Sequence, residues 1–117
     1  MYKSAILGCG GRARGHARAY EHVVGGKLAA ICDMDTARLD AFGDHFGISA
    51  RYNDVHEMLD VEKPDLLHVV TQPDLRVPLL TIAVDPQTPA VIVEKPIALQ
   101  GEDYRQLRDL DARSDTK

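Results

Sequence analysis

The chain has 117 residues, of which 44% are hydrophobic and 27% are charged, and its formal net charge is −4 at pH 7. This length predicts one domain, residues 1–117, with a core large enough to fold without a structural metal or disulfide. The acidic balance argues against a general nucleic-acid-binding or anionic-membrane surface, and no apolar run approaches the about 20 residues that span a bilayer.

The N-terminus and the cysteines indicate a cytoplasmic protein. Met1, Tyr2 and Lys3 lead directly into a strand pattern, which leaves no room for a signal peptide. Cys9 and Cys32 fit reduced thiols, although both lie at predicted strand ends and a disulfide between adjacent strands is conceivable. We expect no metal site, because neither cysteine has a partner at metal-ligand spacing.

Short apolar runs alternate with helical patterns along the first half of the chain. The first expected strand covers residues 3–7, and the helix after it stops at Gly25-Gly26. Spacings of three and four residues give this helix one apolar face, made by Ala13, Ala17, Tyr20 and Val24. The second expected strand, residues 28–32, is continuously apolar, as is typical of a strand covered on both faces.

The middle of the chain continues the alternation. A helix is expected over residues 36–46, and Gly47 is its C-terminal stop. A short strand over residues 49–52 follows, and Asn53 or Asp54 then caps a brief helix with an apolar face.

The last part of the chain completes a pattern of five strands. The fourth and fifth strands are expected over residues 66–70 and 90–93, and a final helix begins at about Gly101. Pro78 fits the helix between these strands only in its first turn, so that helix begins late or is kinked. Five strands that alternate with helices and are joined by short links predict an α/β fold, a doubly wound parallel sheet in a single domain.

Clustered glycines lie between the first expected strand and its helix, in the sequence Gly8-Cys9-Gly10-Gly11-Arg12-Ala13. The spacing G-x-G-x-x-A is typical of a turn that holds the pyrophosphate of a dinucleotide. Gly8 allows a sharp turn, Gly10 allows the backbone to approach the phosphates, and Ala13 allows close helix–strand packing. The helix N-terminus adds N–H groups that favour an anion. The alternative is a glycine-rich strand–helix turn with no ligand.

An acidic residue follows the second expected strand at the distance that a dinucleotide site requires. Asp33 lies 20 residues past Ala13, where a carboxylate accepts both hydroxyls of the adenosine ribose. Its charge repels a 2′-phosphate, so we predict NAD as the cofactor and NADP as less favoured. Met34 and Arg38 belong to the same predicted cofactor-binding region, although Arg38 also fits a solvated helix surface. The alternative for Asp33 is a helix cap.

Polar residues also follow the fourth and fifth expected strands. Thr71-Gln72-Pro73 and Glu94-Lys95-Pro96 come beyond the carboxyl ends of parallel strands, where ligands bind in such sheets. Lys95 could donate a proton to, or hold, the carbonyl or hydroxyl that reacts, and it is our predicted catalytic residue. The alternative is a surface lysine that pairs with Glu94.

The five histidines fall into three groups. His16 lies near the start of the helix after the glycines and is expected to face the cleft. His68 lies inside an apolar strand, where a hydrogen-bonded core imidazole is favoured over a catalytic one. His22, His45 and His56 are expected on helix surfaces.

Together these motifs resemble the N-terminal half of the glucose–fructose oxidoreductase / inositol dehydrogenase family, often written Gfo/Idh/MocA. The resemblance covers nearly the whole chain and is carried by the glycine motif with His16, Cys32-Asp33, Tyr52-x-Asp54, Pro64-Asp65, Thr71-x-Pro73 and Glu94-Lys95-Pro96. In that family this half is a Rossmann domain that binds NAD or NADP. The resemblance implies an active-site role for Lys95, a place near the nicotinamide ribose for Glu94, dinucleotide contacts for Thr71 and Pro73, and a ribose contact for Asp33.

Two departures affect the nicotinamide side of the expected site. Gln72 stands where the family usually has a proline, and Arg76 stands where it usually has a histidine. A proline-bearing loop over residues 85–89 replaces the usual glycine turn before the fifth strand. These changes alter the backbone that would line the nicotinamide side of the cofactor.

The resemblance also implies what the chain does. Family members oxidise or reduce sugars, polyols and related hydroxy compounds, and a second domain, with no counterpart in these residues, supplies most of the substrate pocket and the oligomer interface. We therefore expect the chain to bind NAD with little or no turnover, to meet a substrate only with a second domain, and to self-associate through uncovered surface. A stand-alone dinucleotide sensor or interaction module without catalysis stays open as the alternative.

Overall fold

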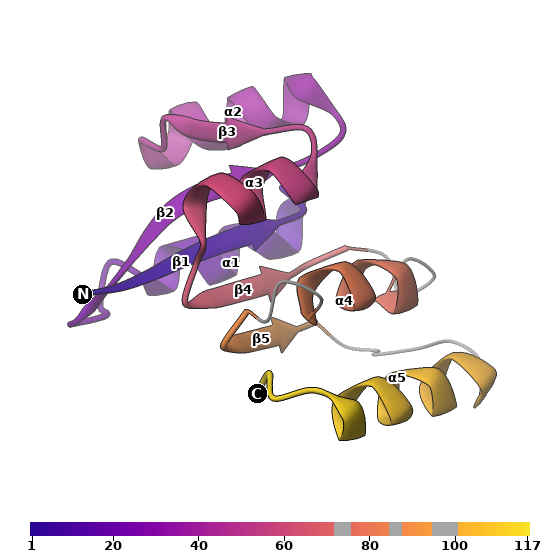
Figure 1. The fold of residues 1–117 in the computed structure, drawn as a ribbon. Helices are drawn as coiled ribbons and strands as arrows, with labels where there is room; N and C mark the ends of the chain where they lie inside the picture. The colour runs from indigo at the N-terminus through magenta and orange to yellow at the C-terminus, as the bar shows by residue number, and fades with distance from the viewer. Residues whose placement is uncertain (72–75, 85–87, 95–100) are drawn as a thin grey trace.

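Strands and helices alternate along the whole chain (Figure 1). The computed structural model describes residues 1–71, 76–84, 88–94 and 101–117. The elements are β1 (Tyr2–Leu7), α1 (Gly11–Ala19), β2 (Gly26–Cys32), α2 (Thr36–Phe46), β3 (Ala50–Tyr52), α3 (Val55–Glu62), β4 (Leu66–Val69), α4 (Arg76–Val84), β5 (Ala90–Val93) and α5 (Gly101–Arg113). The expected helix over 36–46 and the expected strand over 90–93 have these same bounds.

All four strand pairings are parallel, and the strand order is β3-β2-β1-β4-β5. At the carboxyl end of the central strand, Leu7 pairs with Cys32 of β2 on one side and with Val69 of β4 on the other. From β1, the chain adds β2 and then β3 on one side of the sheet, and it then crosses over to add β4 and β5 on the other side. The order reverses between β1 and β4, and in sheets of this kind the ligand crevice lies beyond the carboxyl ends of the strands at that point. The doubly wound α/β fold is confirmed.

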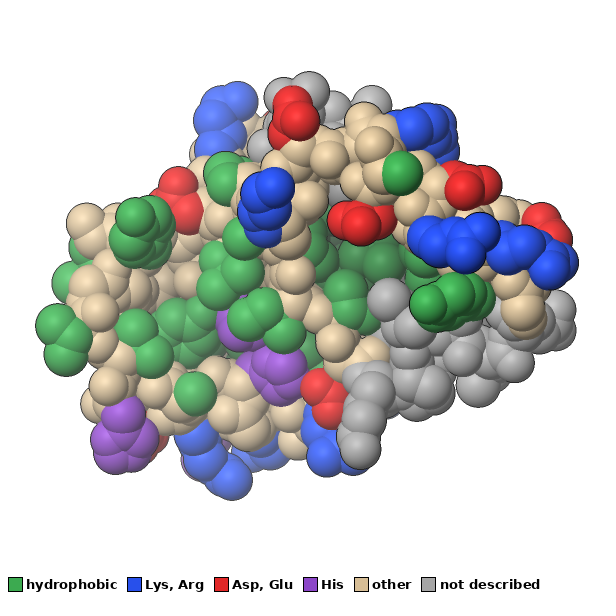
Figure 2. Space-filling view, turned by 90° about the horizontal axis from the view of Figure 1, so that it is seen from below, with side chains coloured by type: hydrophobic (Ala, Val, Ile, Leu, Met, Phe, Trp, Pro, Cys, Tyr) green, Lys and Arg blue, Asp and Glu red, His purple; other side chains and the backbone are tan. Residues whose placement is uncertain are grey.

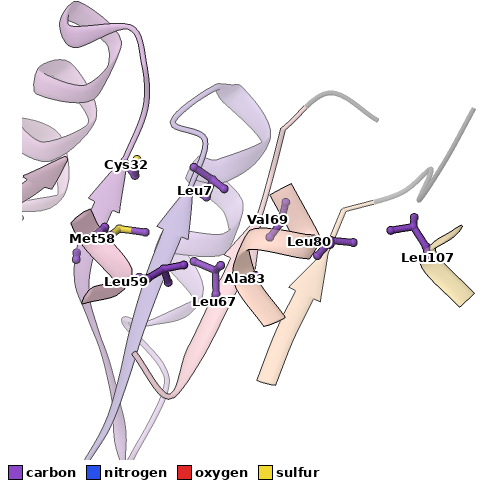
Figure 3. Packing of buried hydrophobic residues seen from close by; sticks show 11 residues of the cluster. Leu7, Cys32, Met58, Leu59, Leu67, Val69, Leu80, Ala83 and Leu107 are labelled. Carbon is purple, nitrogen blue, oxygen red and sulfur yellow. The ribbon is translucent and has the colours of Figure 1, made fainter. Parts of the chain in front are cut away.

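Each face of the sheet is covered by its own helices. Alternate side chains of β1 point to opposite faces, so Ile6 packs against α1 and α2, and Ala5 and Leu7 pack towards α3, α4 and α5. Figure 3 shows the hydrophobic cluster on the α3, α4 and α5 side, in which Leu7, Leu67 and Val69 of the sheet lie among Leu59, Leu80 and Ala83 of the helices. Burial of this apolar area on both faces is the main stabilising term of the fold.

Helix α1 is shorter than its apolar pattern predicts. Tyr20 is its C-cap, and successive N–H groups from Tyr20 onward bond to carbonyls three residues back, which tightens and ends the helix. Val24 is 99% exposed, so its expected place on the buried helix face is wrong. Gly25, at φ +89°, turns the chain, and Gly26 already pairs with Tyr2. The helix therefore ends six residues before Gly25, and Gly25-Gly26 form the turn into β2 and not the stop of the helix.

Pro78 lies within α4, close to the first described residue of this helix, Arg76. Pro78 is the third residue of α4, and in the first turn of a helix the missing proline N–H costs no hydrogen bond. In the described parts of the chain, no helix is both long and apolar enough to cross a membrane.

Candidate functional site

The turn after β1 depends on glycine at its first position for reasons internal to the fold. Gly8 has a φ of +100°, which side-chain-bearing residues rarely adopt. A Cβ on Gly8 would lie 2.4 Å from the Val70 carbonyl oxygen and 3.2 Å from the Thr71 methyl carbon. The turn therefore lies directly against the segment that follows β4, and Thr71 is part of the same crevice.

The second and third glycines of the motif have no such internal reason. Gly10 is the N-cap of α1 with φ −80° and ψ −171°, an extended conformation open to any residue. A Cβ on Gly10 or on Gly11 would meet no heavy atom of the described residues within 4 Å. No side chain among the described residues caps α1. Among the described residues, nothing fills the space beside Gly10 and Gly11 at the helix start, which fits a phosphate group and leaves room for its close approach.

Asp33 joins the end of β2 to this turn. Its Oδ2 accepts a hydrogen bond from the Cys9 N–H at 2.9 Å, and its Oδ1 accepts one from the Asp35 N–H at 2.8 Å. The N-cap of α2 is Asp35, whose carboxylate accepts the Arg38 N–H at 3.1 Å. The alternative interpretation of Asp33 as a helix cap is wrong, because Asp35 is the N-cap of α2 and Asp33 Oδ2 bonds to the glycine turn.

Arg38 and Met34 lie at the outer rim beside Asp33. The nearest guanidinium nitrogen of Arg38 is 3.9 Å from Asp33 Oδ2, and the Arg38 side chain is 56% exposed, against 11% for Asp33. Such an exposed pair contributes little to stability. Met34 is exposed. The acidic group thus dominates the crevice at this end, and Arg38 is solvated while remaining within reach of an anion.

Cys9 and Cys32 line the inner side of the turn as free, buried thiols. Burial, with Asp33 nearby, raises the pKa of each thiol to about 12, so neither is a thiolate near neutral pH. Cys9 therefore contributes its backbone N–H and its packing to the site, and its thiol is chemically inert. Ala13 is fully buried below the turn, which allows close packing of α1 on the sheet.

Glu94 directly follows β5 and meets the helix that starts at the glycines. Its N–H bonds to the Val69 carbonyl at 3.1 Å, which continues the sheet to this point. One carboxylate oxygen is 3.2 Å from Arg12 Nε, and the other is 3.0 Å from His16 Nε2. The carboxyl end of β5 is thereby fastened to α1, and His16 lies at the crevice as expected.

His68 is a buried imidazole with both ring nitrogens engaged. Its Nδ1 is 2.9 Å from His16 Nδ1, and its Nε2 is 2.6 Å from the Tyr20 hydroxyl. Burial, followed by the nearby His16, lowers the pKa of His68 to about 4, so the ring is neutral near pH 7. The expectation of a hydrogen-bonded core histidine is confirmed.

The chain matches, over residues 2–117, the Gfo/Idh/MocA group described as an oxidoreductase family with an NAD-binding Rossmann fold. It belongs to this family. D-apiose dehydrogenase from Paraburkholderia graminis is 35% identical over 106 residues, which are 91% of this chain and 28% of that protein. The chain thus spans less than a third of that relative's length, and it corresponds to the NAD-binding domain of the family.

Solved structures with the same fold agree. An oxidoreductase from Agrobacterium radiobacter, in complex with NAD+, L-tartaric acid and magnesium, is 32% identical with a TM-score of 0.86, over 95% of this chain and 32% of that one. A myo-inositol 2-dehydrogenase from Lactobacillus plantarum also has a TM-score of 0.86, at 24% identity, over 97% of this chain and 33% of that one. This second likeness shows the shared fold.

Most of the predicted Gfo/Idh/MocA site residues lie around one crevice. The structure brings together the glycine motif, Asp33, Arg38, Thr71 and Glu94, and the predicted residues Gln72, Pro73 and Lys95 lie outside the described residues. Sequence reasoning missed the contact of His68 with His16 and Tyr20. Tyr20 follows His16 by one helical turn, which is a usable signal, but nothing local places His68 of β4 beside them.

Proposed function

We propose that this chain binds NAD in the crevice between the glycine turn and the end of β2. The observation that carries the proposal is the hydrogen bond from the Cys9 N–H to Asp33, because it sets an acidic side chain beside an open helix start. In this arrangement the N–H groups that begin α1 bind the diphosphate, and Asp33 accepts the ribose hydroxyls. The relative from A. radiobacter, in complex with NAD+, supports this assignment.

The preference for NAD over NADP follows from the charge at the end of β2. Asp33 is largely buried, so its carboxylate would repel a 2′-phosphate with little screening by solvent. Arg38 is the one cation paired with Asp33 among the described residues, and its exposed side chain offers only weak compensation. The balance of charge favours a free 2′-hydroxyl.

For the whole protein we propose hydride transfer between NAD and an alcohol carbon of a sugar or polyol. The substrate class is supported by the relative D-apiose dehydrogenase, at 35% identity. When bound, the nicotinamide ring accepts or gives the hydride. Lys95 would hold the substrate oxygen and move its proton, since it directly follows the Glu94 that is fastened to α1. Thr71, with Gln72 and Pro73, would line the dinucleotide beside Gly8.

Calorimetric titration of the chain with NAD and with NADP tests the cofactor proposal. We expect saturable NAD binding that is tighter than NADP binding. Asp33→Ala should weaken NAD binding about tenfold or more, because it removes hydrogen bonds to a charged acceptor, and should leave NADP binding less affected. Asp60→Ala, an exposed position on α3, is the matched control. Absence of binding at millimolar NAD, or an unchanged NAD-to-NADP ratio in Asp33→Ala, would refute the proposal.

A further inference from the structure

Four side chains from three elements form one connected row on the α1 side of the sheet. The row runs from the Tyr20 hydroxyl to His68 Nε2 at 2.6 Å, from His68 Nδ1 to His16 Nδ1 at 2.9 Å, and from His16 Nε2 to Glu94 at 3.0 Å. In Figure 2, which views the molecule from below Figure 1, histidine side chains lie near the middle of the visible surface, next to an acidic side chain and bordered by hydrophobic ones. The row thus connects a core strand with the end of β5.

When His16 is neutral, the direction of every hydrogen bond in the row follows from its end at Glu94. A carboxylate only accepts, so His16 Nε2 carries a proton. In neutral His16 the other nitrogen, Nδ1, must then accept from the Nδ1–H of His68. His68 Nε2 is left without a proton and accepts from the Tyr20 hydroxyl. One tautomer of each ring satisfies all three bonds.

His68 and Tyr20 therefore stabilise the tautomer of His16 that donates its Nε2–H to Glu94. If the proton of His68 were on Nε2, its bare Nδ1 would face the bare Nδ1 of neutral His16, and the two rings would repel each other. The two imidazoles also stand edge to face, with ring centroids 5.1 Å apart, so His68 fixes the orientation of the His16 ring. The contact with His68 thus fixes the ring plane of His16 and reinforces its tautomer from the buried side.

His16 is the better anchor of Glu94, although Arg12 also reaches it. The Arg12 side chain is 71% exposed and the His16 side chain is 16% exposed. An exposed guanidinium is mobile and screened by salt, so it fixes a carboxylate loosely. A partly buried imidazole held on its far side by a second ring has far fewer orientations to lose.

We propose that His68 and Tyr20 are positioning residues of the cofactor site, which act through His16 to hold the Glu94 carboxylate in place for the nicotinamide half of the dinucleotide. The inference rests on the proposed function: with the adenosine ribose at Asp33 after β2 and the diphosphate at the glycine turn after β1, the nicotinamide half extends toward β4 and β5, where Glu94 lies. Neither His68 nor Tyr20 touches the cofactor. Their effect is to reduce the freedom of Glu94 before the ligand arrives, which lowers the cost of binding.

The test compares two ligands that share their adenosine half. NAD contains the nicotinamide riboside and ADP lacks it, so a loosened Glu94 weakens the binding of NAD alone. We expect His68→Leu to weaken NAD binding about fivefold, the worth of one ordinary hydrogen bond, and to leave ADP binding unchanged. His68→Asn keeps an N–H donor near the position of Nδ1 and should restore most of the NAD affinity. His56→Leu, the same exchange at an exposed site on α3, is the control.

Nitrogen-15 NMR of the histidine rings gives a readout that needs no ligand. At about pH 9, well above the ordinary histidine pKa of about 6.5, His68 should carry its proton on Nδ1 and His16 on Nε2. Tyr20→Phe removes one donor at little cost to packing, and it should lower the share of His68 that carries its proton on Nδ1, because only the bond to His16 then favours that tautomer. This variant keeps the test open if His68→Leu fails to fold.

The outcomes separate the inference from the proposed function. Failure of the unaltered chain to bind NAD would refute the proposed function, and the inference with it. Binding of NAD with equal weakening of NAD and ADP in His68→Leu would make His68 merely structural and overturn the inference alone. A wild-type His68 with its proton on Nε2 at alkaline pH would also overturn it.

Discussion

Gly8 and Gly10 stand two residues apart, and the structure gives their replacement by alanine opposite consequences. Gly8→Ala would force an alanine to φ +100° and set its Cβ 2.4 Å from the Val70 carbonyl oxygen. The left-handed backbone costs about 1–2 kcal/mol, and the overlap with backbone atoms adds about 1–3 kcal/mol, so the free energy of unfolding should fall by about 2–5 kcal/mol.

Gly10→Ala should leave the fold almost untouched. The residue already has a negative φ, and its Cβ would meet no heavy atom of the described residues. The lower entropy of the unfolded chain offsets the weaker N-cap preference of alanine, so the free energy of unfolding should change by no more than about 0.5 kcal/mol. NAD binding should nevertheless fall about 100-fold, because the new methyl group occupies the space through which the phosphates approach the N–H groups.

Urea unfolding and calorimetric titration of both variants measure the two effects separately. Gly11→Ala is a useful third variant, since its Cβ also meets no heavy atom of the described residues. The reasoning would be refuted if Gly10→Ala lost as much stability as Gly8→Ala. It would equally be refuted if Gly10→Ala bound NAD with unchanged affinity, because the space beside Gly10 would then not be where the phosphates bind.

Three further predictions follow from protonation states and from the extent of the site. The pKa of His68 falls from an ordinary 6.5 to about 4 on folding, so its contribution is neutral above pH 6.5 and destabilises the fold as the pH drops towards 4. That loss amounts to about 3 kcal/mol, and it should be absent from His68→Asn when urea unfolding of the two proteins is compared at pH 7 and pH 4. Because the pKa of each thiol is about 12, Cys9 and Cys32 should resist iodoacetamide in the folded chain at pH 8 and react fully in urea, as followed by mass spectrometry; rapid labelling of the folded chain would contradict this. Finally, this chain alone should produce no NADH absorbance when it is mixed with NAD and a panel of sugars and polyols. Hydride transfer needs the reacting carbon of the substrate held at about 3 Å from the nicotinamide ring. Measurable turnover would contradict that expectation.

The elements were predictable where the signal is local. Helix α2 has a periodic apolar face, an aspartate at its N-cap and Gly47 at its C-cap with φ +69°, so each end is encoded within a few residues. The edge strand β5 is a short β-branched run between a proline-rich loop and a charged residue. In both cases the bounds follow from the chain itself.

The failures share a physical cause. Val24 fits the apolar spacing of α1, but the strand pairing of Gly26 with Tyr2 takes the chain away before the helix can reach it. The described partners of Glu94 are Arg12 and His16, some 80 residues away, and the sequence predicted neither contact. Contacts of this kind are set by how α1 lies across β4 and β5, and no local pattern encodes that placement.

The different reasons for Gly8 and Gly10 have a consequence for descent. A homologue that has lost nucleotide binding but kept this fold would still require glycine at position 8, where the Val70 carbonyl excludes any side chain. Position 10 would then accept other residues, because a side chain there would clash only with a bound nucleotide and with no heavy atom of the described residues. A related protein that keeps the first glycine and has lost the second is therefore expected to have kept the fold and lost nucleotide binding.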